Sequence, residues 1–154
     1  MTASRRTVLV VEDDPMNREL FEAVLVAAGF IVITARDAHT GIEEAKRRHP
    51  DVVLMDIQLP EMDGLEATRI LRGDTETSAI PIIAVTAHAK KEDEDHCLMA
   101  GCVRHLSKPV DTRALPGILA QVIDEAGVEQ PPAEEPDSIT ETLPSRLTTT
   151  AKSS

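Results

Sequence analysis

Five polar side chains in this sequence combine residue types that suit phosphoryl chemistry on a carboxylate. Glu12 and Asp13 follow one short apolar run, Asp56 follows another, and Thr86 and Lys108 lie just after two more. Three carboxylates held close together cannot all stay ionised without compensation, and one lysine neutralises only part of their charge. Mg²⁺ prefers carboxylate oxygens, retained waters and a phosphate as ligands, so a bound Mg²⁺ ion would neutralise the remaining negative charge. Such a set suits transfer of a phosphoryl group to a carboxylate, which depends on positioning and charge neutralisation.

The apolar runs that precede these residues predict buried strands. They are short, rich in β-branched residues and mostly continuous rather than alternating, which is typical of strands covered on both faces of a parallel sheet. The predicted strands span residues 8–11, 31–33, 52–55, 82–85 and 103–106. The second run is followed by no comparable reactive group. In an open parallel sheet, ligands bind beyond the carboxyl ends of the strands, so the five side chains are expected in one pocket.

Segments of helical periodicity separate these runs. The first helix is predicted with Asp14 as its N-cap, Pro15 at its first position and Gly29 just beyond its end. Further helices are predicted around residues 42–45, at 65–71 and at 91–100. The last one is expected to begin near Leu115 or to be kinked, because Pro116 would clash inside a helix that began earlier. Strict strand–helix alternation predicts an α/β fold with five βα units and a doubly wound parallel sheet.

Composition excludes several classes of function. The chain holds 16 Lys and Arg against 27 Asp and Glu, a net charge of −11, which does not suit binding to nucleic acid. Two Phe and no Tyr or Trp leave no stacking platform for bases. The longest apolar run, residues 23–33, is too short to cross a membrane, and the N-terminus has no secretory signal. We therefore expect a cytoplasmic protein with reduced cysteines and no partner that is a nucleic acid or a membrane.

The domain is predicted to span residues 7–127. Residues 1–6 form an N-terminal extension, and residues 128–154 are rich in Pro, Ser, Thr and acids without apolar periodicity. Such a composition cannot bury enough apolar surface to offset the entropy of ordering, so the last segment is expected to be a disordered tail.

Four segments in a fixed order carry a family resemblance. VLVVEDDPMNRELF, DVVLMDIQLPEMDG, PIIAVTAH and HLSKPVD resemble the receiver (response-regulator, CheY-like) domain of bacterial two-component signalling. The match covers roughly residues 6–126, and it is most similar to stand-alone receivers of the DivK type and to receivers of hybrid histidine kinases. The resemblance implies the flavodoxin-like strand order 2-1-3-4-5, which makes the four strands with reactive ends neighbours.

The resemblance also implies roles for the clustered residues. Asp56 would accept a phosphoryl group from the phosphohistidine of a histidine kinase or of a phosphotransfer protein. Mg²⁺ would be held by Glu12, Asp13, Asp56 and the backbone carbonyl of Gln58. Thr86 and Lys108 would bind phosphoryl oxygens, and Thr86 would report phosphorylation by changing position.

Further positions follow from the same resemblance. The Lys108–Pro109 peptide bond is expected to be cis. Gln58 and His88 would tune the loss of the phosphoryl group. His105 stands where many receivers have Tyr or Phe as part of the switch, and its ring has a polar edge. The fourth helix, fifth strand and fifth helix form the usual face for a downstream protein target.

The function predicted is that of a single-domain response regulator, which acts by phosphorylation-dependent protein contact or as a phosphorelay and has no DNA-binding output domain. It would be a phosphoacceptor rather than an enzyme. One alternative is the receiver portion of a larger hybrid kinase or regulator. Another is an aspartyl-phosphate phosphohydrolase, although Gln58 stands where such enzymes commonly need a second Asp. A flavodoxin-like nucleotide binder lacks support, because no Gly-rich loop follows the first predicted strand.

Overall fold

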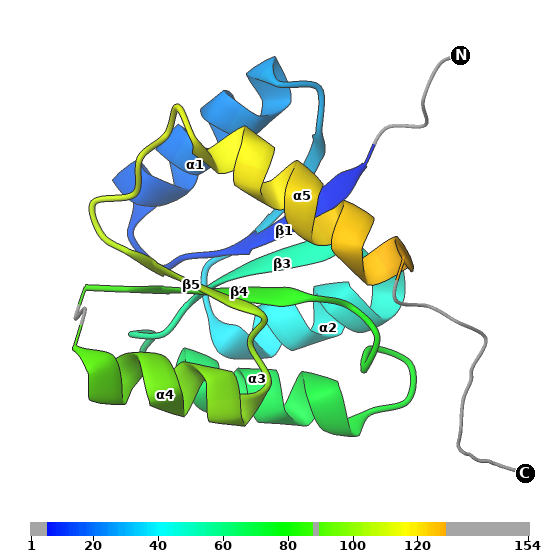
Figure 1. The fold of residues 1–154 in the computed structure, drawn as a ribbon, viewed down its shortest axis with the longest axis vertical. Helices are drawn as coiled ribbons and strands as arrows, with labels where there is room; N and C mark the ends of the chain where they lie inside the picture. The colour runs from blue at the N-terminus through cyan, green and yellow to red at the C-terminus, as the bar shows by residue number, and fades with distance from the viewer. Residues whose placement is uncertain (1–5, 88–89, 129–154) are drawn as a thin grey trace, which may run out of the picture. The chain divides into compact units, whose positions relative to one another are not determined.

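A five-stranded parallel sheet forms the centre of the computed structural model, which describes residues 6–87 and 90–128 (Figure 1). The strand order β2-β1-β3-β4-β5 confirms the predicted fold class and topology. The strands are β1 (Thr7–Val11), β2 (Ile31–Ala35), β3 (Val52–Asp56), β4 (Ile82–Thr86) and β5 (Arg104–Ser107). The predicted tail lies outside the described residues from residue 129 onward.

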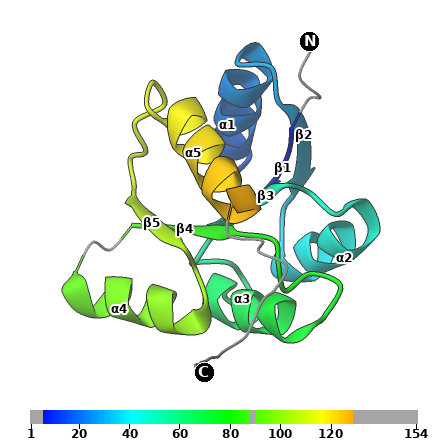
Figure 2. The ribbon, with the colours of Figure 1, turned by 45° about the vertical axis from the view of Figure 1, so that its right-hand side comes forward.

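Helices cover both faces of the sheet, as Figures 1 and 2 show. Helices α1 (Pro15–Ala27) and α5 (Leu115–Val128) lie on one face. Helices α2 (Ala38–Arg48), α3 (Gly64–Gly73) and α4 (Lys91–Ala100) lie on the other. The described residues up to 123 form one compact unit, and the described part of the second unit is the end of α5. Among the described residues, no helix is long and apolar enough to span a membrane.

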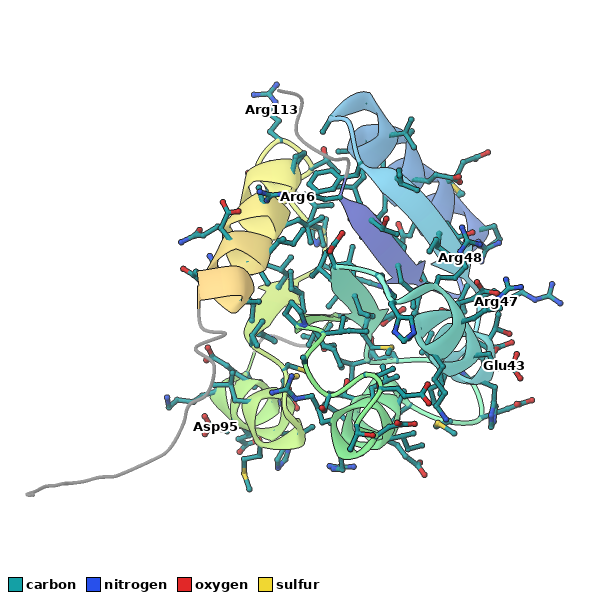
Figure 3. The ribbon with its side chains drawn as sticks, turned by 90° about the vertical axis from the view of Figure 1, so that its right-hand side faces the viewer. Arg6, Glu43, Arg47, Arg48, Asp95 and Arg113 are labelled. Atoms are coloured by element: carbon teal, nitrogen blue, oxygen red, sulfur yellow. The ribbon has the colours of Figure 1, made fainter. Side chains whose placement is uncertain are left out.

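Two apolar cores follow from the alternation of side chains along the strands. On one face, Leu9 and Val53 pack with residues of α2, α3 and α4, whereas on the other Val10 and Leu54 pack with residues of α1 and α5. Both cores are almost entirely aliphatic, as the composition requires. Charged side chains such as Arg47 on α2 point away from the sheet (Figure 3). Every residue of β3 and of β4 is buried, so the strands that end in Asp56 and Thr86 are enclosed along their whole length.

Local signals in the sequence set the helix ends. Asp14 caps α1, because its side chain accepts a hydrogen bond from the backbone N–H of Met16 at 3.1 Å. Helix α5 begins at Leu115, so Pro116 lies in the first turn, where a missing N–H costs little. Strand β5 begins one residue later than predicted: its register with β4 starts at Arg104, although the N–H of Val103 still donates to the carbonyl oxygen of Ile82 at 2.8 Å.

Gly64 marks a close approach between two backbones. It is the first residue of α3, and its N–H donates to the carbonyl oxygen of Ile57 at 2.9 Å. A Cβ atom at this position would overlap the carbonyl oxygen of Asp56 and would lie 2.8 Å from the Cα atom of Ile57. The absence of a side chain therefore lets α3 start directly against the end of β3.

Candidate functional site

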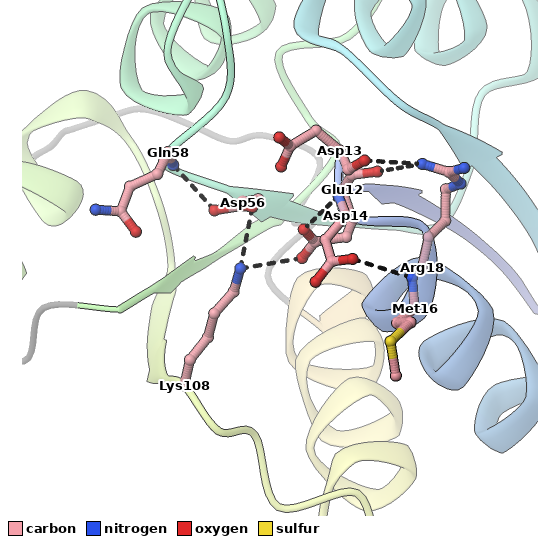
Figure 4. Close-up of polar contacts among 8 residues, drawn as sticks. All are labelled: Glu12, Asp13, Asp14, Met16, Arg18, Asp56, Gln58 and Lys108. Atoms are coloured by element: carbon pink, nitrogen blue, oxygen red, sulfur yellow. Dashed lines mark hydrogen bonds and ion pairs between the residues drawn. The ribbon is translucent and has the colours of Figure 1, made fainter.

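The carboxyl ends of β1 and β3 bring three acids together. Glu12 follows β1 and is 1% exposed, Asp56 ends β3 and is 2% exposed, and Asp13 lies on the exposed turn into α1. One carboxylate oxygen from each residue lies within 4.8 Å of the others (Figure 4). The adjacent pairing of β1 and β3 places these ends side by side. Three carboxylates that share such a small space suit a divalent cation with oxygen ligands.

Lys108 supplies the positive charge at this cluster. Its Nζ atom lies 3.1 Å from Oδ2 of Asp56 and 3.2 Å from Oε1 of Glu12. The backbone N–H of Lys108 donates to the carbonyl oxygen of Thr86 at 2.8 Å, which extends the pairing of β4 with β5. Thr86 itself ends β4 and is 3% exposed, and the Lys108–Pro109 peptide bond is cis. The structure therefore gathers the five residues that the sequence singled out.

The Asp56 carboxylate is held at both oxygens. Oδ1 accepts a hydrogen bond from the backbone N–H of Gln58 at 2.9 Å, while Oδ2 faces Lys108. The side chain of Gln58 is exposed, and His88 lies outside the described residues. A carboxylate fixed in this way has a defined orientation toward the crevice, which a nucleophile needs for productive attack.

Burial and charge shift the pKa values of two groups in the cluster. Burial raises the pKa of Glu12 to about 7, and the nearby Asp56 charge adds to this, while the N–H of Asp14 and the charge of Lys108 oppose it. Burial acts to lower the pKa of Lys108, but the hydrogen bond and charge of Asp56, helped by Glu12, raise it above its ordinary value. Without a metal ion, Lys108 stays charged. Glu12 is then a mixture of its protonated and ionised forms near neutral pH.

The raised pKa of Glu12 predicts a pH dependence of stability. The folded protein retains a proton that the unfolded chain loses near pH 4.5. The stabilisation from this group is therefore fully present below pH 4.5 and is lost as the pH rises through about 7. We expect the free energy of unfolding in EDTA to fall more steeply between about pH 5 and pH 8 in the wild type than in Glu12→Gln. Parallel pH profiles of the two proteins in chemical denaturation would contradict this expectation.

His105 lies near the cluster in sequence but makes a different kind of contact. It is a half-buried residue of β5 and pairs in register with Ala84 of β4. Among the described residues, its Nε2 atom is buried without a hydrogen-bond partner. Its side chain therefore places a polar nitrogen at a buried position where the ring of a Phe would be apolar.

Arg18 is a residue of the site that the sequence analysis missed. Its Nη1 atom donates to the main-chain carbonyl oxygens of Glu12 at 2.9 Å and of Asp13 at 3.4 Å (Figure 4). Arg18 lies one helical turn after the cap residue Asp14, and its backbone N–H donates to the carbonyl of Asp14 at 2.9 Å. That spacing is the signal that could have found it, because a long side chain one turn into a helix can reach back to the preceding loop.

A family model described as the response regulator receiver domain matches residues 8–120. The chain belongs to this receiver family. The polar-differentiation response regulator DivK of Brucella ovis is 44% identical over 105 residues, which cover 68% of this chain and 85% of that protein. The DivK of Brucella anthropi is 43% identical over the same coverage.

Solved receiver structures share the fold. The receiver domain of a sensor histidine kinase from Pseudomonas aeruginosa has a TM-score of 0.73 at 37% identity, covering 79% of this chain and 99% of that one. That structure holds a magnesium ion coordinated in the active-site cleft. A CheY-like receiver from Methanospirillum hungatei has a TM-score of 0.76 at 28% identity, covering 82% of this chain and 99% of that one. The acid cluster of the present receiver has the ligand chemistry that such an ion requires.

Proposed function

We propose that this receiver accepts a phosphoryl group on Asp56 from the phosphohistidine of a histidine kinase or a phosphotransfer protein. One observation carries the proposal. The Asp56 carboxylate is buried at a strand end and oriented by Lys108 and by the N–H of Gln58, with the carboxylates of Glu12 and Asp13 within 4.8 Å. This arrangement combines a nucleophile, a fixed cation and a set of metal ligands in one crevice.

The proposed step is a displacement at phosphorus. An oxygen of Asp56 attacks the phosphorus atom, the P–N bond to the donor imidazole breaks, and its electron pair returns to the imidazole nitrogen. The product is an acyl phosphate on Asp56. Lys108 pairs with a phosphoryl oxygen, and the Thr86 hydroxyl binds another and changes position. The other residues of the site act by positioning the reacting groups and neutralising their charge, because phosphoryl transfer depends on these two effects.

The acids fit a bound Mg²⁺ ion. Glu12, Asp13, Asp56 and the backbone carbonyl of Gln58 would hold it, and the ion would neutralise charge that develops on the phosphoryl oxygens. Lys108 supplies only one positive charge, and burial already makes ionisation of Glu12 costly. The chain's own part is therefore to bring the carboxylates together and to orient Asp56.

We propose that the phosphorylated receiver contacts a downstream protein through α4, β5 and α5, or that it relays the phosphoryl group. Either output would take place in the cytoplasm. The receiver, residues 7–127, would act alone, rather than as an enzyme or a DNA-binding regulator. The DivK relatives support the stand-alone form, and the kinase-derived receiver supports the alternative of a portion of a larger protein. The mass of the native protein, isolated from its source cells, separates these two forms.

Incubation with Mg²⁺ and a small phosphodonor, followed by intact mass spectrometry, tests the proposal. We expect one phosphoryl group per chain in Mg²⁺ and none in EDTA. Sustained hydrolysis of phosphate esters by the unlabelled protein would instead favour a phosphohydrolase. Absence of labelling in Mg²⁺ with every donor class, including a phosphorylated phosphotransfer protein, would overturn the assignment.

The half-buried position of His105 predicts that partner binding can be changed without an equal change in phosphoryl uptake. We expect His105→Tyr to change affinity for the downstream partner more than it changes the rate of phosphorylation, because residue 105 lies on β5 beside Ala84 and outside the contacts that hold Asp56. Calorimetric titration of the phosphorylated proteins with the partner, set beside labelling rates, measures both quantities. A change confined to the labelling rate would refute the prediction. Gln58→Ala serves as the opposite control, since it is expected to alter the lifetime of the phosphoryl group.

A further inference from the structure

Arg18 reaches from α1 to the backbone of the turn that carries two of the acids. Its Nη1 atom donates to the carbonyl oxygens of Glu12 and Asp13, at 2.9 and 3.4 Å. Among residues 6–87 and 90–128, the guanidinium forms hydrogen bonds to these main-chain oxygens and no ion pair with a carboxylate. The contact therefore fixes the turn without using a carboxylate oxygen of Glu12 or Asp13.

The turn needs such a contact because its two acids differ in how they are held. Glu12 is buried, and its Oε2 atom accepts the N–H of Asp14 at 3.1 Å, whereas Asp13 is exposed. Strand β1 ends at Val11, and the last backbone bond into the sheet is the Glu12 N–H to Ala35, at 2.9 Å. Beyond that bond, the direction of Asp13 depends on the conformation of the turn itself.

We infer that Arg18 is a positioning residue for Mg²⁺ in this receiver, one that sets the directions of the Glu12 and Asp13 carboxylates through their backbone carbonyls. The inference rests on the proposed function, because it concerns the same metal site. Groups outside the ligand shell that orient metal ligands commonly account for 10- to 100-fold of metal affinity.

Charge and geometry predict opposite outcomes at this position. A guanidinium close to the site repels a divalent cation, so removal of its charge alone would strengthen Mg²⁺ binding. Loss of the two hydrogen bonds would weaken it, because the carboxylates would have to be ordered when the ion binds. The sign of the change in affinity therefore separates a positioning residue from a bystander charge.

The experiment is an Mg²⁺ titration of metal-free, isotopically labelled protein, followed by backbone amide chemical shifts. We expect Arg18→Met to weaken Mg²⁺ binding about tenfold, with Tm in EDTA close to that of the wild type. Arg18→Lys, which keeps a donor on a shorter side chain, is expected to restore part of the affinity. Arg69→Met removes the same charge from an exposed position on α3 and should leave the affinity unchanged.

Equal or tighter Mg²⁺ binding by Arg18→Met would overturn the inference while the wild type still binds Mg²⁺ and takes up a phosphoryl group. Failure of the wild type to bind Mg²⁺ would instead overturn both the inference and the proposed metal site. Should Arg18→Met prove unfolded, Arg18→Ala is the second variant, because it also lacks a side-chain donor, and the same tenfold loss is expected. Affinity of Arg18→Ala at the wild-type level would count against the inference.

Discussion

Asp56→Asn is expected to abolish covalent uptake of a phosphoryl group, to less than about 1% of the wild-type extent. An amide cannot act as the attacking oxygen nucleophile, although its carbonyl oxygen can still accept the N–H of Gln58. The substitution also removes the partner that Lys108 contacts at 3.1 Å. Intact mass spectrometry after incubation with Mg²⁺ and a small phosphodonor measures the extent of labelling.

Asp51→Asn is the matched control for this variant. Asp51 immediately precedes β3, at the opposite end from Asp56, where its Oδ2 atom accepts the backbone N–H of Thr7 at 2.8 Å. An asparagine oxygen can keep that bond, so we expect normal labelling. Equal labelling of Asp56→Asn and the wild type would mean that another residue accepts the phosphoryl group.

Gly64→Ala is expected to lower the free energy of unfolding by about 3 kcal/mol. The added methyl group would overlap the carbonyl oxygen of Asp56 and would lie 2.8 Å from the Cα atom of Ile57. These are backbone atoms, so they cannot rotate away as the end of a side chain could. The clash must displace either the start of α3 or the end of β3, and the second of these also misplaces Asp56. Chemical denaturation followed by circular dichroism measures the loss.

Gly73→Ala shows what the same substitution does where there is room. Gly73 ends α3, and a Cβ atom there meets nothing within 4 Å. We expect it to raise the free energy of unfolding by up to about 1 kcal/mol, because alanine has less freedom to lose on folding. Equal stability of the two variants would show that the backbone at Gly64 moves aside without cost.

The sequence predicted the existence of the strands more accurately than the residues at which they begin and end. Buried β-branched runs identify strands from local composition alone, and all five were found. However, β2 continues to Ala35, because Thr34 and Ala35 pair with Val10 and Val11. That pairing depends on the neighbouring strand β1, so the sequence around Thr34 and Ala35 does not indicate it. The start of α5 at Leu115 was predictable, since Pro116 restricts the backbone wherever it occurs.

The site was predictable as a set of residues but not as a set of contacts. Reactive side chains at strand ends follow from topology, so Glu12, Asp56 and Lys108 were expected together. That Lys108 contacts both acids, and that Arg18 holds the turn by its carbonyls, depends on side-chain directions that spacing alone does not define. The crowding at Gly64 was missed because it arises from the approach of two backbones, which spacing along the chain does not define either.

The order of these residues along the chain also determines when the acids gain a positive partner during synthesis. The acids follow β1 or end β3, which are neighbours in the sheet, whereas Lys108 follows Asp56 by 52 residues along the chain. At about 5–20 residues per second, the acids leave the ribosome several seconds before their lysine. The nascent chain thus has mutually repelling carboxylates until β5 docks. The last strand to be made is directly followed by the lysine that offsets part of this repulsion.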